Sequence, residues 1–472
     1  MISRCPRNLL VFACILATAT AALAADQPAS LTGRRIDGYR GIWFALGQKS
    51  DHGDKYSGGL GTYTAKHRPL AIYAPEANKT FFVYGGTTAA DQRHLLAMIA
   101  YYDHATGTVP RPVIVHDKQT VDDPHDNPSL SIDPQGHLWV FVSGRGRRRP
   151  GFIYRSAEPY SIDRFELVRE DEFTYPQPMW HPRNGCVLLF TRYTNGRELY
   201  WATSPDGRTW SDARKLVSGG HYQISEMSGD RVVTAFNTHL PPNNVDTRTN
   251  LYFLQTDDMG KTWRTAEGGA VTPPLEPVDN AALVRDYRAE GLLVYVKDIT
   301  FDHAGWPVVL YITSRDHRPG PAGSPRTWTI ARWMGKAWKF IKVAPATHNY
   351  DMGSLYIEPD GTWRIIAPTE PGPQQWGTGG EIAVWTSGDD GATWKKQRQV
   401  TADSPRNHGY VRRPLNAHDD FYGFWADGNA DILSPSRLYF TNRHGDKLWR
   451  LPYDMAGDEA KPEVFRTPAK FE

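Results

Sequence analysis

A short motif of the pattern Ser/Thr-x-Asp-x-Gly-x-Thr-Trp recurs along the chain. It reads TDDMGKTW at residues 256–263 and SGDDGATW at residues 387–394, and SPDGRTW at residues 204–210 keeps the pattern with one residue deleted. Asp accepts hydrogen bonds from the backbone of a tight turn, Gly tolerates the positive φ that such turns need, and Trp brings a large ring to pack between sheets. A turn that recurs in this way indicates a repeat architecture in which each copy is a small sheet.

Short apolar runs between turn residues make up most of the remaining chain. The clearest are residues 71–73, 80–84, 95–102, 138–142, 187–191, 292–296 and 308–313. Strands of this length with frequent turns are typical of a sandwich, a barrel or a propeller. The repeated motif, known as the Asp-box, favours the propeller.

Turn glycines recur along the chain at irregular intervals, so some blades would carry long loops and one of these turns can be an extra. Looser turns of the same kind occur at residues 133–139, 302–306 and 360–363, and the turn glycines are Gly136, Gly207, Gly260, Gly305, Gly361, Gly391 and Gly428. Residues 25–472 give 64 residues to each of seven blades, against about 40–50 in a common propeller repeat. We therefore predict one all-β domain, a seven-bladed β-propeller with Asp-box turns over residues 25–472. Asp-boxes specify a fold and not a chemistry, so the function has to be sought elsewhere.

Composition and charge exclude several other classes of protein. Disorder does not fit a chain that is 40% hydrophobic with a net charge of only +2. A helical bundle does not fit 42 Gly and 35 Pro spread along the sequence. Because 54 Lys and Arg stand against 52 Asp and Glu, no cationic excess indicates a nucleic-acid partner.

The N-terminus has the pattern of a secretory signal peptide. Arg4 and Arg7 precede an apolar run at residues 9–17, and Ala22-Leu23-Ala24 fits a signal-peptidase site. We expect residues 1–24 to be removed and the protein to be periplasmic or extracellular; a lipoprotein anchored at Cys14 is the weaker alternative. The run is too short to span a membrane. The mature chain would keep only Cys186, so we expect no internal disulfide and a monomer held together by its core.

Candidate catalytic residues do not belong to any standard motif. The chain has no His-Glu-x-x-His, no paired Cys spacing, no Gly-rich phosphate loop and no Gly-x-Ser-x-Gly elbow. His104 lies in the turn at residues 101–107, His125 in the polar segment 122–130, and Tyr175 in a Pro-rich segment at residues 173–180. Arg192 ends an apolar strand, where an arginine calls for a counter-charge or an anionic ligand. Taken singly, each also fits a surface histidine or a structural ion pair.

Longer segments resemble a known family. They are GYRGIWFALGQ (38–48), DKYSGGLGTYTAKH (54–67), KTFFVYGG (79–86), YYDHATGTVPRP (101–112), HDNPSLSIDPQGHLWVF (125–141), RPGFIYRSAEPYSIDRFE (149–166) and FTYPQP (173–178). They are similar to the BNR-repeat seven-bladed propellers that include ulvan lyases, rhamnose–glucuronate lyases and α-L-rhamnosidases. The resemblance runs from about Gly38 into the C-terminal blades and is densest before residue 210. It implies a site of two His, one Tyr and one Arg, which fall on His104, His125, Tyr175 and Arg192.

The resemblance also implies a reaction, which these residue types suit. A uronic acid with a sugar on its oxygen 4 can be cleaved by β-elimination once its carboxylate is neutralised, and we assign that task to His104 and Arg192. In glucuronate the carbon 5 proton and the leaving oxygen lie on one side of the ring, so one group can act as base and then as acid. We predict that Tyr175 is this group if nearby cations lower its pKa, with His125 as the competing base. Further substrate-binding candidates are Gln48, His67, Asn127, Tyr193 and His221.

Two other functions stay open at this stage. The first is an α-L-rhamnosidase that hydrolyses the same linkage, in which a histidine of the first-blade loop at residues 47–56 would act. Gln48 cannot act as an acid or base, His52 is close by, and nothing in the sequence pairs the carboxylates of Asp51, Asp54 and Asp419. The second is a non-catalytic sugar-binding propeller, which the four retained site residues disfavour.

Cofactors and remaining candidates complete the sequence-based expectations. No organic cofactor is implied, and a structural calcium or zinc ion stays open. Cys186 with His181 could form half of a metal site, although a buried free thiol is the simpler interpretation. The run from His348 to Asp351 is a candidate for the funnel or for the central channel.

Overall fold

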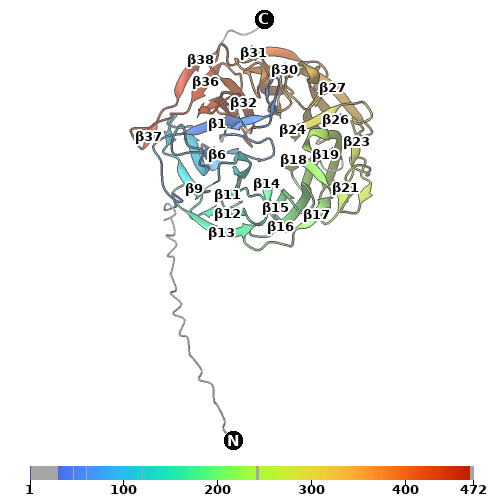
Figure 1. Ribbon diagram of the computed structural model, residues 1–472, viewed down its shortest axis with the longest axis horizontal. Coiled ribbons are helices and arrows are strands. Elements are labelled where there is room, and N and C mark those ends of the chain that lie inside the picture. Colours follow the sequence, from blue (N-terminus) through green and yellow to red (C-terminus); the bar gives the residue numbers. More distant parts are fainter. Residues whose placement is uncertain (2–29, 46, 60, 120, 241–243, 468–472) are drawn as a thin grey trace. The chain divides into compact units, whose positions relative to one another are not determined.

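Seven antiparallel sheets form a ring around a common centre in the computed structural model (Figure 1). The structure describes residue 1 and residues 30–467, except residues 46, 60, 120 and 241–243. The predicted signal peptide and its boundary after residue 24 lie outside the described residues. The chain divides into the units Met1–Ser30 and Leu31–Glu472, and the sheets belong to the second unit. The prediction of a seven-bladed β-propeller is therefore confirmed.

Each of the first three blades is an up-and-down meander of four strands, and in blade 4 the last strand turns back to pair with the third. Figure 1 shows the first strands of blades 3 and 4 nearest the centre of the ring. Blade 1 consists of β5 (Ala71–Ala74), β6 (Lys79–Gly86), β7 (Leu96–Asp103) and β9 (Val113–Asp117). Blade 2 consists of β10 (Pro128–Ile132), β11 (Leu138–Val142), β12 (Gly151–Ser156) and β13 (Phe165–Asp171). Blade 3 consists of β14 (Thr174–His181), β15 (Gly185–Arg192), β16 (Glu198–Ser204) and β17 (Arg214–Val217). Blade 4 consists of β18 (Gly220–Ser228), β19 (Arg231–His239), β20 (Arg248–Thr256), β21 (Trp263–Arg264), β22 (Ala270–Val271) and β23 (Leu283–Arg285).

The last three blades continue the same order. Blade 5 consists of β24 (Leu293–Phe301), β25 (Pro307–Ser314), β26 (Thr327–Trp333) and β27 (Trp338–Pro345). Blade 6 consists of β28 (Ser354–Ile357), β29 (Trp363–Glu370), β30 (Glu381–Ser387) and β31 (Lys395–Gln399). Blade 7 consists of β32 (Asn407–Arg412), β33 (Gly423–Gly428), β35 (Leu438–Thr441), β36 (Lys447–Arg450) and β38 (Glu463–Arg466). The helices of the described residues are single 3₁₀ turns: η1 (Pro75–Ala77), η2 (Pro124–Asp126), η3 (Val245–Thr247) and η4 (Pro321–Gly323). No helix in the described part of the chain is long and apolar enough to cross a membrane.

Strands outside the blades join the first and last parts of the ring. β1 (Gly41–Ala45) pairs with both β34 (Ser434–Ser436) and β4 (Ser57–Gly59), and β8 (Val109–Pro110) pairs with β37 (Glu459–Ala460). A short hairpin of β2 (Lys49–Ser50) and β3 (Gly53–Asp54) completes the strands. Figure 1 shows the blue N-terminal strands beside the red C-terminal ones. Ring closure therefore depends on backbone hydrogen bonds between segments that are far apart in the sequence.

Apolar side chains fill the spaces between neighbouring blades. Between blades 3 and 4, for example, Trp201, Phe236 and Leu254 pack in one cluster of buried residues. A cluster of this kind occupies each of the seven contacts around the ring in the described part of the chain. Since Cys186 is a buried free thiol and the other cysteines lie outside the described residues, this packing holds the described blades together.

The repeated turns place a glycine against a tryptophan ring. In the turn that starts at Thr256, the Asp258 side chain accepts a hydrogen bond from the Thr262 N–H at 2.9 Å, and Gly260 has φ +80°. A Cβ atom on Gly260 would lie 2.4 Å from Nε1 of Trp201, which is buried. Gly207 of blade 3 approaches Trp139 of blade 2 in the same way, whereas Gly391 packs on Trp363 within blade 6. At Gly260 and Gly207 the turn chemistry and the packing between blades therefore depend on the same glycine.

We expect Gly260→Ala to destabilise the protein more than Gly268→Ala. Both glycines have positive φ, but a Cβ on Gly268 would have no neighbour within 4 Å. Placing alanine at positive φ costs about 1–2 kcal/mol in both variants. Only Gly260→Ala adds the cost of overpacking against Trp201, about 1–3 kcal/mol. Chemical unfolding of the two variants measures the difference. Equal losses of stability would contradict the packing role of Gly260.

Candidate active site

A cavity opens at the mouth of the ring where the first strands of the blades begin. In an up-and-down blade, the start of the first strand and the connection between the second and third strands lie at the same mouth. Side chains from these positions in many blades therefore meet there. The lining residues are Tyr56, Tyr63, Thr64, Ala65, Lys66, His125, Arg145, Tyr175, Arg197, Tyr222, Asn237, Val245, Arg248, Tyr295, Val296, Lys297, Tyr350 and Tyr410.

Arginines give the cavity its charge. Arg145, Arg197 and Arg248 all line it, and no carboxylate does so among the described residues. The Arg248 guanidinium lies 4.7 Å from the ring centres of both Tyr222 and Tyr295. It also donates a hydrogen bond to the Tyr350 hydroxyl at 2.8 Å. Guanidinium groups keep their charge when buried, so the cavity is built to receive an anion.

Two lysines of the cavity, unlike its arginines, have pKa values that are lowered by burial. Burial, with help from Lys297 and Arg248, lowers the pKa of Lys66 well below its usual value. Burial also lowers the pKa of Lys297 to about 7. Their ammonium groups donate to backbone oxygens, Lys66 to Val296 at 2.6 Å and Lys297 to Asn349 at 2.7 Å. The permanent positive charge of the cavity therefore comes from the arginines.

Tyr175 and Tyr222 form a pair in front of these arginines. Their ring centres are 5.6 Å apart, and the two rings meet edge-on. Tyr175 is the second residue of β14 and has φ +55°, with its N–H donating to the Ser143 hydroxyl at 3.1 Å. A bulky residue with positive φ is uncommon and is often found at functional sites.

The two phenols have opposite pKa shifts. Burial, followed by Tyr193 and Tyr222, raises the pKa of Tyr175 well above its usual value. Burial also opposes ionisation of Tyr222, but Arg197, Arg248 and the hydrogen bond from Tyr175 together bring the pKa of Tyr222 below its usual value. The cations that we expected to act on Tyr175 therefore act most strongly on its partner. Of the two phenols, Tyr222 therefore has the lower pKa.

His125 is held by a second set of contacts at the edge of the cavity. Its Nδ1 lies 2.5 Å from Oδ1 of Asp123, and its Nε2 lies 3.1 Å from the Tyr63 hydroxyl. Burial opposes ionisation of Asp123, but the hydrogen bond and charge of His125, followed by Arg145, lower the pKa of Asp123. The ionised Asp123 favours the tautomer with a proton on Nδ1, which leaves Nε2 as an acceptor for the Tyr63 hydroxyl.

The catalytic residues expected from the sequence fall in three places. Tyr175 and His125 line the cavity, with ring centres 6.0 Å apart. Arg192 lies at the same mouth but outside the lining, where its Nε donates to the Glu172 carbonyl at 2.8 Å and its guanidinium pairs with Asp171. His104 lies at the opposite mouth, because the turn after β7 joins the third and fourth strands of blade 1. The structure brings together two of the four residues.

The expected substrate-binding residues lie one contact away from the cavity. Gln48 donates to the Tyr56 hydroxyl at 3.0 Å, and Asn127 donates to the Tyr63 carbonyl at 2.6 Å. His67 is buried, its Nε2 lies 3.1 Å from the His125 carbonyl, and its ring contacts that of Tyr175 edge-on. These three residues position lining residues and are not part of the lining themselves.

Tyr193 and His221 differ in how they relate to the cavity. The Tyr193 ring lies below the guanidinium groups of Arg145 and Arg197, at 5.3 and 5.4 Å. His221 is buried between backbone carbonyls, with Nδ1 2.9 Å from the Asn237 oxygen. Burial lowers the pKa of His221 to about 4. Tyr193 supports the arginines, whereas His221 has a structural environment.

The three arginines and Tyr222 are not among the residues predicted from the sequence. Arg145 and Arg197 lie in the connections between second and third strands, and Arg248 is the first residue after such a connection. Tyr222 lies near the start of the first strand of blade 4, as Tyr175 does in blade 3. Their common feature is the position within the blade, so counting strands along the sequence would have grouped them with Tyr175.

The fold and the site together define a class of protein: seven-bladed propellers with a cationic, tyrosine-rich cavity at one mouth of the ring. The model of the BNR repeat-containing family matches residues 81–346, so the chain belongs to this family.

Sequence comparison finds similarity to two curated proteins. The chain is 22% identical over 255 residues to an ulvan lyase of Alteromonas sp. (strain LOR), covering 46% of this chain and 52% of that protein. It is 22% identical over 306 residues to Ulvan Lyase-PL25 of Pseudoalteromonas sp. (strain PLSV), covering 55% and 62%. The match spans less than two thirds of each relative's length.

Solved structures share the fold at low sequence identity. A PL25 ulvan lyase, also solved bound to -[GlcA(1-4)Rha3S]-, has a TM-score of 0.65 and 16% identity, covering 87% of this chain and 96% of that chain. The polysaccharide lyase Uly1 has a TM-score of 0.57 and 13% identity, covering 88% and 98%. At these identities the likeness shows the fold alone.

Proposed function

We propose that the protein is a polysaccharide lyase that cleaves L-rhamnose-α-1,4-D-glucuronate linkages by β-elimination. The observation that carries this proposal is the Tyr175–Tyr222 pair beside three arginines in a cavity without a lining carboxylate among the described residues. A uronate lyase needs a cation for the substrate carboxylate and a base and acid on one side of the sugar ring. This arrangement can supply all three.

Carboxylate neutralisation is the first step of the proposed reaction. The carbon 5 proton of glucuronate becomes acidic only when the charge that develops on its carboxylate is stabilised. Arg145, Arg197 and Arg248 line the cavity around the tyrosine pair and can donate paired hydrogen bonds to a carboxylate. We assign this task to these arginines and not to His104 and Arg192, which lie outside the cavity.

Proton transfer follows on one face of the sugar. The Tyr222 phenolate takes the proton from carbon 5, and the electron pair of that C–H bond forms the double bond between carbons 4 and 5. The bond between carbon 4 and the bridging oxygen breaks with its electron pair, and the oxygen takes a proton from the Tyr175 hydroxyl. Tyr222 ends protonated and Tyr175 ends as a phenolate. A proton transfer from the Tyr222 hydroxyl to the Tyr175 phenolate restores the starting state.

His125 has the role of a support in this scheme. Asp123 holds its ring by the 2.5 Å contact to Nδ1, and its Nε2 faces the Tyr63 hydroxyl within the cavity lining. A substrate hydroxyl could take the place of Tyr63 as the donor to Nε2. His125 remains the competing base if the substrate binds nearer to this edge of the cavity than to Tyr222.

The substrate class and the compartment rest on similarity and on the N-terminal sequence. Both curated relatives are named ulvan lyases, and the PL25 structure was solved with an oligosaccharide that contains glucuronate and rhamnose 3-sulfate. The cationic cavity suits such an acidic glycan. Ulvan and rhamnose-capped arabinogalactans both contain the linkage in question. Export to the periplasm or the cell exterior, as residues 1–24 predict, would bring the enzyme to these polymers.

One incubation distinguishes the proposed lyase from its alternatives. The protein is mixed with rhamnose–glucuronate glycans while the ultraviolet absorbance of the unsaturated uronate and the release of free reducing rhamnose are followed together. Rising absorbance supports the lyase. Rhamnose without absorbance would overturn it in favour of the hydrolase, and binding without either product would indicate a sugar-binding module.

We expect Tyr222 to titrate below the usual tyrosine pKa of about 10. Arg197 contributes most to this lowering, so Arg197→Gln should move the titration to higher pH, and Tyr222→Phe should remove it. The phenolate exists above its pKa, so a lower pKa makes the base available at lower pH. Ultraviolet absorbance of tyrosinate measures this without any substrate. Arg208→Gln, at an exposed turn, is the matched control, and an unchanged titration in Arg197→Gln would contradict the assignment.

A further inference from the structure

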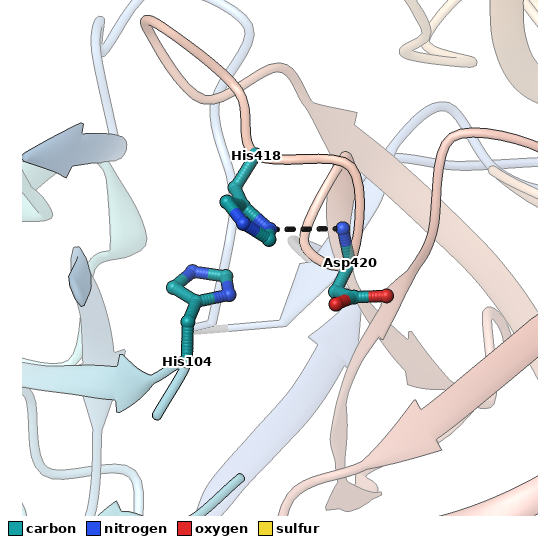
Figure 2. A group of neighbouring side chains, drawn as sticks. All are labelled: His104, His418 and Asp420. Atoms are coloured by element: carbon teal, nitrogen blue, oxygen red, sulfur yellow. Dashed lines mark hydrogen bonds between the residues drawn. The ribbon is translucent and has the colours of Figure 1, made fainter. Parts of the chain in front are cut away.

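Two histidines and an aspartate meet at the mouth opposite the cavity. They are His104 from the turn between β7 and β9 of blade 1, and His418 and Asp420 from the connection between β32 and β33 of blade 7. One ligand atom of each lies within 4.8 Å of the other two. Figure 2 shows the three side chains facing one another from the two segments. None of them takes part in the proposed elimination.

His104 is oriented as metal-binding histidines usually are. Its Nε2 lies 2.8 Å from the Thr80 hydroxyl, whereas its Nδ1 is buried and has no hydrogen-bond partner among the described residues. If Nε2 carries the proton and donates to Thr80, the Nδ1 lone pair is free; the other tautomer would leave a buried N–H without an acceptor. Burial, followed by His418, also lowers the pKa of His104 to about 4, so that its ring is neutral near pH 7.

His418 and Asp420 supply the remaining donor atoms. The ring centres of His418 and His104 are only 3.8 Å apart, and His418 Nδ1 accepts the Asp420 N–H at 3.1 Å. Ligation through Nδ1 of His418 would replace that hydrogen bond, whereas ligation through its Nε2 would keep it. Ligand atoms 2.0–2.2 Å from a tetrahedral zinc ion lie roughly 3.5 Å apart, so the side chains would have to close by about 1 Å. All three are half-buried on turns, where small rotations suffice.

We propose that His104, His418 and Asp420 bind a divalent first-row transition metal, with zinc as the best match, and that this ion clamps blade 1 to blade 7. Two imidazoles and one carboxylate are ligands that zinc prefers, and water can take the fourth position. The adjacent contact between the blades includes two backbone hydrogen bonds, Tyr73 N–H to Leu415 O and Leu415 N–H to Ala71 O, both 2.9 Å. An ion here would add a cross-link to the closure of the ring.

Zinc titration of the chelator-treated protein tests this proposal. Calorimetry should give one zinc ion per chain, and zinc should raise the melting temperature in proportion to the logarithm of its concentration. His104→Ala, His418→Ala and Asp420→Asn should each weaken binding by at least about 10–100-fold. His444→Ala, at an exposed histidine outside the cluster, should bind zinc as the unchanged protein does.

Asp420→Asn and a spectroscopic measurement distinguish a lost zinc ligand from a variant that does not fold. Asp420→Asn keeps the N–H donated to His418 and removes only the carboxylate. X-ray absorption of the zinc-loaded protein should show nitrogen and oxygen ligands without sulfur. The proposal is overturned if zinc does not bind, if the three variants bind it as the parent does, or if sulfur ligation points to Cys186. These outcomes do not depend on lyase activity, so they leave the proposed function untouched.

Discussion

Tyr175→Phe should lower lyase turnover by about 10²–10⁴-fold, which is the usual contribution of one positioned general acid or base. The substitution removes the hydroxyl that we propose as the acid for the leaving oxygen, and whose hydrogen bonding lowers the pKa of Tyr222. Its loss should also raise the pKa of Tyr222, so the remaining activity should shift to higher pH. Substrate binding should change little, because the arginines of the cavity are retained. Initial rates across pH, followed by the absorbance of the unsaturated product, give kcat and KM separately.

A matched control separates the chemical role of Tyr175 from the loss of any hydroxyl. Tyr101→Phe removes a hydroxyl from a partly buried tyrosine of β7, which does not line the cavity, and should leave turnover unchanged. The fold of both variants is checked by circular dichroism and chemical unfolding. If Tyr175→Phe retains full turnover on a substrate that the parent enzyme eliminates, Tyr175 is not the acid, and the His125 edge of the cavity becomes the stronger candidate.

The fold could be predicted because its determinants are local. A turn motif carries its Asp, Gly and Trp within eight residues, so it can be recognised without knowing which strands pair. The glycine of each of the three Asp-box copies also packs on a tryptophan ring, as Gly260 does on Trp201. This second function was invisible in the sequence, because Gly260 and Trp201 come from different blades.

The site could be predicted only in part, because it is assembled from several blades. Tyr175 and His125 lie in segments with long matching motifs, whereas Arg145, Arg197 and Arg248 are single arginines in unremarkable loops. No sequence pattern around Arg248 predicts that its guanidinium group lies over the Tyr222 ring. The position of His104 shows the converse problem. Its segment matches well, but a connection between third and fourth strands lies at the other mouth of the ring.

A buried ionic cluster in the centre of the ring connects four blades. Arg68, just ahead of blade 1, donates to Asp298 of blade 5 at 2.5 Å and also pairs with Glu226 of blade 4. Arg413, just after β32 of blade 7, donates to Glu226 at 2.9 Å. Asp298 further accepts the Ile299 N–H and the Leu355 N–H, both at 2.9 Å. Burial raises the pKa of Asp298, but Arg68, Arg413 and these N–H groups outweigh it, so its pKa is lowered overall.

Asp298→Ala should therefore lower the free energy of unfolding by about 3–5 kcal/mol, because it leaves two buried guanidinium groups with too little negative charge. The pH dependence provides a second test. Since folding lowers the pKa of Asp298, its contribution is fully present above the unfolded value of about 3.9 and is lost as the pH falls through the folded value. The parent should thus lose stability in acid more steeply than the variant.

The control is Asp257→Asn, which removes an exposed partner of Arg231. It should lower the free energy of unfolding by no more than about 1 kcal/mol. Equal effects of the two substitutions in chemical unfolding would show that the central cluster does not hold the blades together.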